Sequence, residues 1–178
     1  QPTFRWALAG RNESKLNTLA DTLEGPCPPT GLIVVDGHDQ GQVEMMCARG
    51  RVLATTAGPF SVHGRHVPYA CVKYSTHYTD ITGESPWVRD LIDELHEKAR
   101  EKCVRIVPFC GFDSIPADLG TAHAVAELRR LTGQQCKRVR AAIRFKGGLN
   151  GGTMTTALSM ARQGRSVEMA NPILLNPK

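Results

Sequence analysis

The 178-residue chain lacks several features that would place a protein in a class at once. It has no apolar run near the roughly 18 residues that a membrane span needs, and no basic-then-apolar leader, so we expect no integral membrane segment. Its six cysteines include no C-x-x-C pair, which argues against a zinc site or a disulfide framework. Cys47, Cys71 and Cys103 lie in apolar patterns, where we expect a free thiol to pack as a small apolar group. This cysteine usage favours a reducing, cytoplasmic compartment, with mitochondrial or lipid-droplet association left open.

A strong excess of charge is also lacking. The formal net charge of +5 is too small to indicate nucleic acid, although it suits a protein that binds phosphorylated small molecules. We expect no metal site, because His63 and His66 have no carboxylate spaced with them as a third ligand. With 41% hydrophobic and 22% charged residues, the composition is that of a globular protein.

What the chain does have is a regular alternation of short apolar strands and amphipathic helices. The connections are long enough to join parallel strands, which predicts an α/β fold with a doubly wound parallel sheet. Asn12, and Asp39 with Gln42, predict helix caps, and Pro116 begins a helix to about Leu131. The continuous apolar run "LIVVD" predicts a strand buried on both faces. The strands are expected at Phe4–Gly10, at "LIVVD", at "RVLATTAGPF" including its exit, at "THYTDITGE" and at "VRIVPF".

The pattern changes after Gly133. "KRVRAAIRFKG" alternates with period two and predicts a half-solvated strand of an antiparallel sheet. Its arginine face, formed by Arg138, Arg140 and Arg144, is either solvated or a surface for a second subunit or an acidic partner. We therefore predict one domain over 1–132 and the beginning of a second α+β domain over 133–178, through which the protein forms a homodimer.

A polar cluster follows each of the five expected strands. Because ligands of open parallel sheets bind beyond the carboxyl ends of the strands, these clusters predict one shared binding edge. The clusters are Gly10–Arg11, Asp36–Asp39, Thr55–Phe60, Asp80–Glu84 and Cys110–Ser114.

Arg11 indicates the ligand. A dinucleotide-binding sheet holds the adenosine ribose at the end of its second strand, where an acid suits NAD and an arginine suits the 2′-phosphate of NADP. Here the strand ends in Gly10, which leaves room, and Arg11, while Asn12 adds a donor and Lys15 a charge. The sequence predicts NADP, with NAD as the other nicotinamide cofactor. The alternative is that Arg11 is a surface residue near a helix N-terminus, although a cation at that end opposes the helix dipole.

The G-x-G-x-x-G loop of such a sheet is not in this sequence. Together with the first strand, it should precede residue 4 by some 20 residues. The fold we expect is therefore a doubly wound sheet without its first strand and Gly-rich loop. Because the pyrophosphate then lacks its helix N-terminus, this chain alone should bind NADP poorly and be inactive as an enzyme.

Three stretches, "LAGRNESKL", "TTAGPFSVHGRHVPYACVKYSTHYTDITGE" and "IVPFCGFDSIPADLG", resemble the saccharopine dehydrogenase-like oxidoreductases. That family spans lysine metabolism and lipid intermediates, and the resemblance covers residues 5 to about 162. It implies a Rossmann-like domain in which Arg11 faces the adenosine phosphate and Asp36 or Asp39 approaches adenine. It also implies that a turn runs alongside the ribose and pyrophosphate, and that turn consists of Thr56, Ala57, Gly58 and Pro59.

Two carboxylates and one helix start are the catalytic candidates. Asp80 and Glu84 would act as acid or base, or anchor the nicotinamide ribose, although Asp80 would equally cap turn amides. Asp113 and Ser114 either cap the following helix or bring its first amides to the nicotinamide or substrate. The substrate-binding candidates are Cys110, Gly151, Gly152 and Thr153. The last three belong to "GGLNGGT", for which the alternative is a simple strand-to-helix turn.

Two functions follow from these residues. The first is an NADP(H)-dependent oxidoreductase that transfers a hydride to or from a C=N, C=O or C=C bond of a small metabolite or lipid intermediate. The second is a catalytically inactive nucleotide-binding sensor or scaffold, because no Ser/His, Cys/His or Lys constellation requires catalysis.

Overall fold

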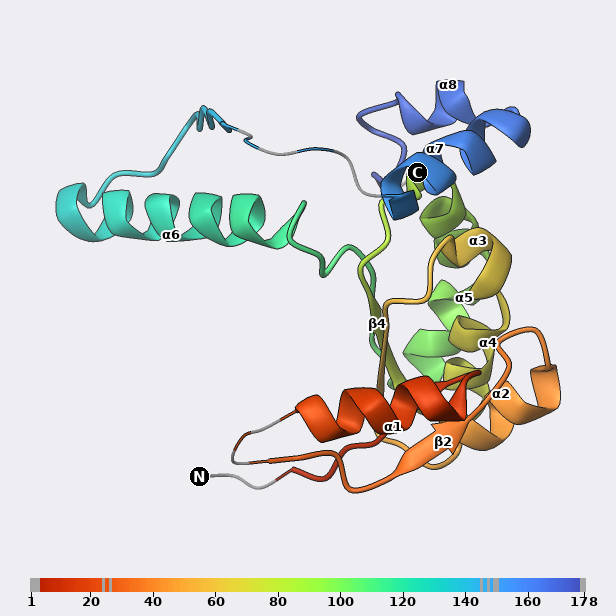
Figure 1. Cartoon of the computed structure of the whole chain (residues 1–178). Helices are drawn as coiled ribbons and strands as arrows, with labels where there is room; N and C mark the ends of the chain where they lie inside the picture. Colours follow the sequence, from red (N-terminus) through yellow and green to blue (C-terminus); the bar gives the residue numbers. More distant parts are fainter. Residues whose placement is uncertain are drawn as a thin grey trace.

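Short parallel strands form the centre of the fold. The computed structural model describes residues 4–23, 25, 27–144, 146, 148 and 151–176, and strands alternate with helices through its first half (Figure 1). Every strand pair in these residues is parallel, which confirms the predicted α/β class. The strands are β1 (Leu8–Gly10), β2 (Leu32–Val34), β3 (Val52–Thr55), β4 (His77–Asp80) and β5 (Ile106–Val107).

The strands pair in two groups. β1 pairs with β2, and β3, β4 and β5 form a three-stranded sheet with β4 in the middle. In the usual doubly wound order, 3-2-1-4-5-6, the first group matches strands 3 and 2 and the second matches strands 4, 5 and 6. No strand of the described residues pairs with the other edge of β1 or of β3. The arrangement fits the Rossmann-like sheet predicted without its first strand.

Local signals set the helix starts. Asn12 accepts a hydrogen bond of 2.9 Å from the amide of Lys15, so this predicted cap is confirmed. Asp39 accepts one of 3.0 Å from the amide of Gln42, whose side chain accepts from the amide of Asp36 instead of completing the box. The helices are α1 (Glu13–Thr22), α2 (Gln40–Cys47), α3 (Phe60–His63), α4 (His66–Lys73), α5 (Ser85–Glu101), α6 (Ile115–Thr132), α7 (Gly151–Arg162) and α8 (Ser166–Met169).

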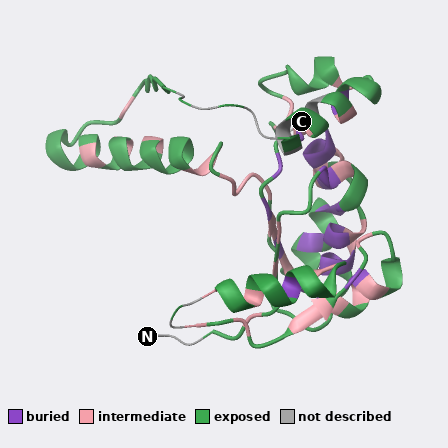
Figure 2. Ribbon diagram, in the orientation of Figure 1, coloured by how far each residue is buried: buried purple, intermediate pink, exposed green. Residues whose placement is uncertain are grey.

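The hydrophobic core lies on one side of the three-stranded sheet. α4 packs on β4, and α2 and α5 pack on α4 (Figure 1). The buried residues gather there, as the purple segments of Figure 2 show. The apolar pattern of α5 predicts four inward residues, of which Val88, Leu91 and Leu95 are buried and Ile92 is partly buried. Cys47 and Cys71 meet in this core with 3.7 Å between their Sγ atoms, as expected of thiols that pack as small apolar groups.

Three expectations from the sequence are wrong. "LIVVD" is not buried on both faces, because no described segment covers Val34, which is 53% exposed. The described residues from 137 to 146 form no strand, because a strand needs a partner and no described segment pairs with them; residues 145 and 147 lie outside the described part. Cys103 is exposed because it forms a turn after α5, with φ of 53°, instead of joining the core.

Helix α6 stands apart from the core. It projects away from the sheet in Figure 1 and carries no buried residue. Gly133 ends it in the left-handed conformation, with φ of 68°, that favours glycine. None of the helices in the described ranges combines the length and apolar character that a membrane crossing requires.

Arginines hold the C-terminal segment against α5. The guanidinium of Arg165 bonds both carboxylate oxygens of Asp90, at 2.5 and 3.0 Å. Arg89 of α5 donates to the carbonyl oxygens of Leu174 and Asn176, at 3.5 and 3.4 Å. These contacts fix α8 and the chain after it on α5, and α7 leads into them above the carboxyl end of β4 (Figure 1).

Candidate functional site

The turns after β4 and β5 meet around Asp80, the last residue of β4. Its buried carboxylate accepts hydrogen bonds from the Tyr78 hydroxyl at 2.7 Å, the Thr82 amide at 3.0 Å and the Phe109 amide at 3.1 Å. Its carbonyl oxygen accepts one from the Cys110 amide at 2.7 Å. Burial raises the pKa of Asp80 above its ordinary value, and the hydrogen bonds oppose that rise. Asp80 therefore makes the turn-capping bonds that the sequence left open as an alternative.

Glu84, the second carboxylate of "YTDITGE", reaches the turn after β3, the strand on the other side of β4 from β5. It is fully buried, and its Oε1 and Oε2 accept hydrogen bonds from the amides of Phe60 at 2.6 Å and Ser61 at 3.0 Å. These are the first two residues of α3. The two carboxylates thus join the three turns that follow β3, β4 and β5.

The turn after β3 is shaped by short-range contacts. The Ala57 amide donates to Thr55 Oγ1 at 3.2 Å, and the Gly58 amide donates to the Thr56 carbonyl at 3.0 Å. A Cβ on Gly58 would lie 3.0 Å from Cε2 of Phe60, so a larger residue would displace that buried ring. Glycine at position 58 therefore lets the turn pass close to the Phe60 ring.

The ends of β1 and β2 form the other half of the edge. The Val35 amide donates to the Gly10 carbonyl at 3.0 Å, and Asp36 accepts a bond of 3.0 Å from the amide of His38. His38 Nε2 and His63 Nδ1 are 2.9 Å apart, which connects the turn after β2 with α3. The structure therefore brings the predicted clusters of both halves to one edge. No group of three or more metal-ligating side chains occurs within the described ranges.

Arg11 lies directly after β1 and is exposed. Its guanidinium makes no hydrogen bond or ion pair with any residue that the structure describes. Lys15 lies one turn further along the chain and is also exposed. The Asn12 side chain caps α1 with its oxygen, which leaves its amide nitrogen for another acceptor. The donor set at this point, two cations and an amide, suits a phosphate ester.

The turn after β5 holds the remaining candidates. Asp113 is exposed, and Ser114 is the N-cap residue of α6 without a side-chain hydrogen bond to that helix. The Ser114 side chain therefore does not make the helix cap that the sequence offered as one alternative. Cys110 is half-buried, and its thiol donates to the Val107 carbonyl at 3.4 Å. Within the part of the chain that the structure describes, neither the Asp113 carboxylate nor the Ser114 hydroxyl makes a hydrogen bond, whereas the carboxylates of Asp80 and Glu84 do.

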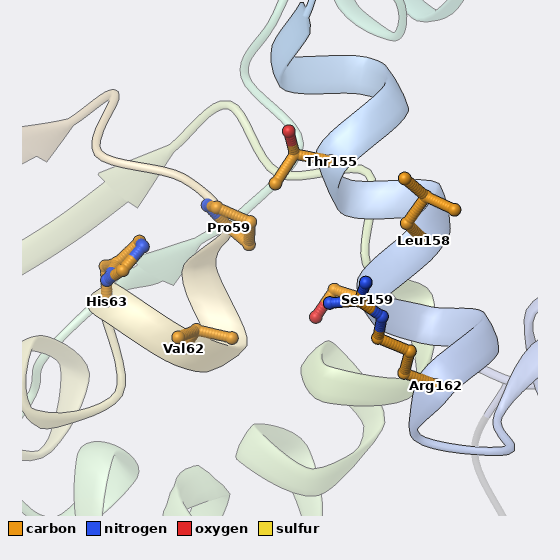
Figure 3. A pocket seen from close by; sticks show the side chains of 7 residues that line it. All are labelled: Pro59, Val62, His63, Thr155, Leu158, Ser159 and Arg162. Atoms are coloured by element: carbon orange, nitrogen blue, oxygen red, sulfur yellow. The ribbon is translucent and has the colours of Figure 1, made fainter.

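A groove of about 220 Å³ lies between α3 and α7. Thr155 and Ser159 project from α7 toward α3, and the guanidinium of Arg162 extends beside Ser159 (Figure 3). Gly151, a predicted substrate residue, is the first residue of α7; Gly152 and Thr153 follow in its first turn, and their side chains lie outside the described part. The groove opens beside the turn that Glu84 holds. Its lining residues are Pro59, Val62, His63, Thr155, Leu158, Ser159 and Arg162.

Comparisons with known proteins agree with the resemblance. No family model matches the chain. A Mycobacterium tuberculosis protein named as a trans-acting enoyl reductase is 33% identical over 183 residues, which cover 97% of this chain and 43% of that protein. A trans-acting enoyl reductase of Mycobacterium ulcerans is 40% identical over 119 residues, 67% of this chain and 28% of that protein. The apo saccharopine dehydrogenase (L-Glu forming) of Saccharomyces cerevisiae has the same fold, with a TM-score of 0.56 at 17% identity over 71% of this chain and 26% of that one.

The chain belongs to the saccharopine dehydrogenase-like family. It spans less than half the length of the two enoyl reductase relatives.

Sequence reasoning missed part of the candidate site. Thr155, Ser159 and Arg162 were not singled out, although their spacing of i, i+4 and i+7 marks one polar face of a helix. The bond between His38 and His63 joins residues 25 apart in the chain, and no local pattern predicts such a pair.

Proposed function

We propose that the whole protein is an NADP(H)-dependent oxidoreductase that transfers a hydride to or from a C=N, C=O or C=C bond of a small metabolite or lipid intermediate. The names of its enoyl reductase relatives support an oxidoreductase. The observation that carries the choice of cofactor is Arg11, an exposed cation at the carboxyl end of a parallel strand with no partner among the described residues. A 2′-phosphate would complete that site.

The residues at the edge suit one orientation of the nucleotide. Arg11 and Lys15 would hold the 2′-phosphate, and Asp36 or Asp39 would lie on the adenine side. The turn from Thr56 to Pro59 would run along the ribose. When bound, NADP(H) supplies or accepts the hydride.

The groove between α3 and α7 is the proposed substrate site. It adjoins Pro59, so a substrate there would lie next to the ribose side of the cofactor. Thr155, Ser159 and Arg162 offer donors to polarise or orient a substrate oxygen. Cys110 and the first turn of α7 remain predicted substrate contacts. Asp113 and Ser114 remain predicted to bring the first amides of α6 to the nicotinamide or substrate.

Turnover of NADPH tests this function. The whole protein is mixed with a panel of imines, ketones and enoyl thioesters, and oxidation of NADPH is followed by absorbance. We expect turnover with at least one class, a large loss in R11A, and partial recovery of R11A with NADH. Tight NADPH binding without turnover of any class would instead favour the sensor or scaffold.

A further inference from the structure

Glu84 has an unusual environment for a residue at a binding edge. Its side chain has no exposure to solvent, and each of its two oxygens accepts one backbone amide. Its own amide donates to Thr82 Oγ1 at 3.0 Å, which orients the chain between β4 and α5. A buried carboxylate is costly unless such donors compensate it, and here both oxygens are compensated.

The two amides that Glu84 holds belong to Phe60 and Ser61, directly after the turn from Thr56 to Pro59. The Phe60 ring is fixed as well, because it stacks on Trp87 with 5.9 Å between centroids and an interplanar angle of 25°. The exit of the turn is therefore held through both its backbone and its side chain. Only the Glu84 bonds carry charge, so they are the strongest of these contacts.

This geometry is unsuited to proton transfer. An acid or base must come within hydrogen-bond distance of the reacting group, directly or through one water. Glu84 would have to leave both amides to do so, and it would leave two buried donors without a partner. The same bonds keep those two amides from binding a phosphate.

We propose that Glu84 is a positioning residue, which holds the Thr56–Pro59 turn in the conformation that lies beside the nucleotide, and is not the acid or base of the reaction. The link to the nucleotide rests on the proposed function. The fixing of the turn by Glu84 rests on the hydrogen bonds alone. The two parts are therefore measured separately.

The first measurement needs no nucleotide. Amide hydrogen exchange of Phe60 and Ser61 is compared in the whole wild-type protein, in E84Q and in the control E94Q. Glu94, on α5, accepts a hydrogen bond of 2.5 Å from the Tyr69 hydroxyl and lies outside the edge. We expect exchange at both amides to rise about tenfold in E84Q and to stay unchanged in E94Q. Unchanged exchange in E84Q would overturn the proposal.

The second measurement separates positioning from catalysis. In E84Q we expect the Kd and KM for NADPH to rise about tenfold, with kcat and its pH profile close to the wild type. Loss of kcat together with one limb of the pH profile, at unchanged NADPH affinity, would assign Glu84 to proton transfer and overturn the proposal. If the wild type binds no NADPH, the proposed function fails, and the exchange result alone decides the role of Glu84.

A wild-type measurement covers the case in which E84Q does not fold. In NMR spectra of the wild type, the amide nitrogens of Phe60 and Ser61 should each show a scalar coupling across the hydrogen bond to the Glu84 carboxyl carbon. Absence of both couplings would contradict the bonds on which the proposal depends.

Discussion

The hydroxyl of Tyr78 donates a hydrogen bond of 2.7 Å to Asp80 Oδ2, two residues further along β4. Side chains two apart on a strand lie on the same face, and both are buried on β4, which packs against α4. The Tyr78 hydroxyl thus holds the carboxylate from within the core, while turn amides hold it from the edge. A core tyrosine and a site carboxylate form one unit.

Removal of the Tyr78 hydroxyl should destabilise the protein measurably. In Y78F a buried carboxylate oxygen loses its donor, and we expect the free energy of unfolding to fall by about 1.5–3 kcal/mol. Urea denaturation followed by circular dichroism measures this change. The matched control is Y74F, which removes an exposed bond of 3.0 Å to Glu44 and should lower the free energy of unfolding by less than Y78F does. Equal losses in the two variants would contradict the importance of the Asp80 bond.

The raised pKa of Asp80 predicts a specific pH dependence. The folded protein keeps the Asp80 proton to a higher pH than the unfolded chain does, mainly because the carboxyl is buried. As pH rises from about 3.9, the unfolded value, through the raised folded value, unfolding free energy falls. In D80N this contribution disappears. Urea denaturation across this range should show wild-type stability falling relative to D80N as pH increases.

The control for this pH dependence is D118N, which makes the same change of charge at an exposed position of α6. Its stability should follow the wild type at each pH. A constant difference between the wild type and D80N at all pH values would show that Asp80 has the same pKa in both states.

Two glycines of α6 should respond to alanine with opposite signs. Gly133 has φ of 68°, so G133A places a Cβ in a left-handed conformation and should cost about 1 kcal/mol. Gly120 lies inside the helix with nothing within 4 Å of an added Cβ, so G120A should stabilise by about 0.5–1 kcal/mol. Thermal loss of helical circular dichroism compares the two. A stabilised G133A would mean that this helix does not end in the conformation described.

Arg165 should control how firmly the C-terminal segment is held. R165A removes the two bonds to Asp90, and we expect amide exchange over residues 163–176 to become about tenfold faster. The matched control is R130A, which breaks an exposed pair with Glu127 on α6 and should leave that exchange unchanged. Equal exchange in R165A and the wild type would show that other contacts hold the segment.

The sequence predicts the elements whose causes are local. The cap of α1 can be predicted because Asn12 binds the amide of Lys15, only three positions away. The start of α5 can be predicted because the ring of Pro86 suits the first turn of a helix. The alternation of strands and helices likewise predicts the polar clusters at the ends of parallel strands, where the structure has them. Helix starts and strand ends therefore follow from short-range chemistry and simple topology.

Roles that depend on distant residues could not be predicted in this way. Glu84 and Phe60 are 24 positions apart, so nothing near Glu84 in the sequence indicates that it binds the amides of α3. The period-two pattern at 137–147 predicts a strand, but a pattern cannot supply the partner that a strand requires. The groove could not be predicted either, because its two walls, α3 and α7, meet only in the folded chain.

The affinity of the whole protein for the two nicotinamide cofactors tests the central claim most directly. Titration calorimetry would measure the Kd of NADPH and NADH for the wild type, R11A and the control R49A, which alters an exposed arginine before β3. If Arg11 binds the 2′-phosphate, R11A should weaken NADPH about tenfold or more and leave NADH unchanged, while R49A changes neither. An R11A variant that binds NADPH as tightly as the wild type would contradict the account.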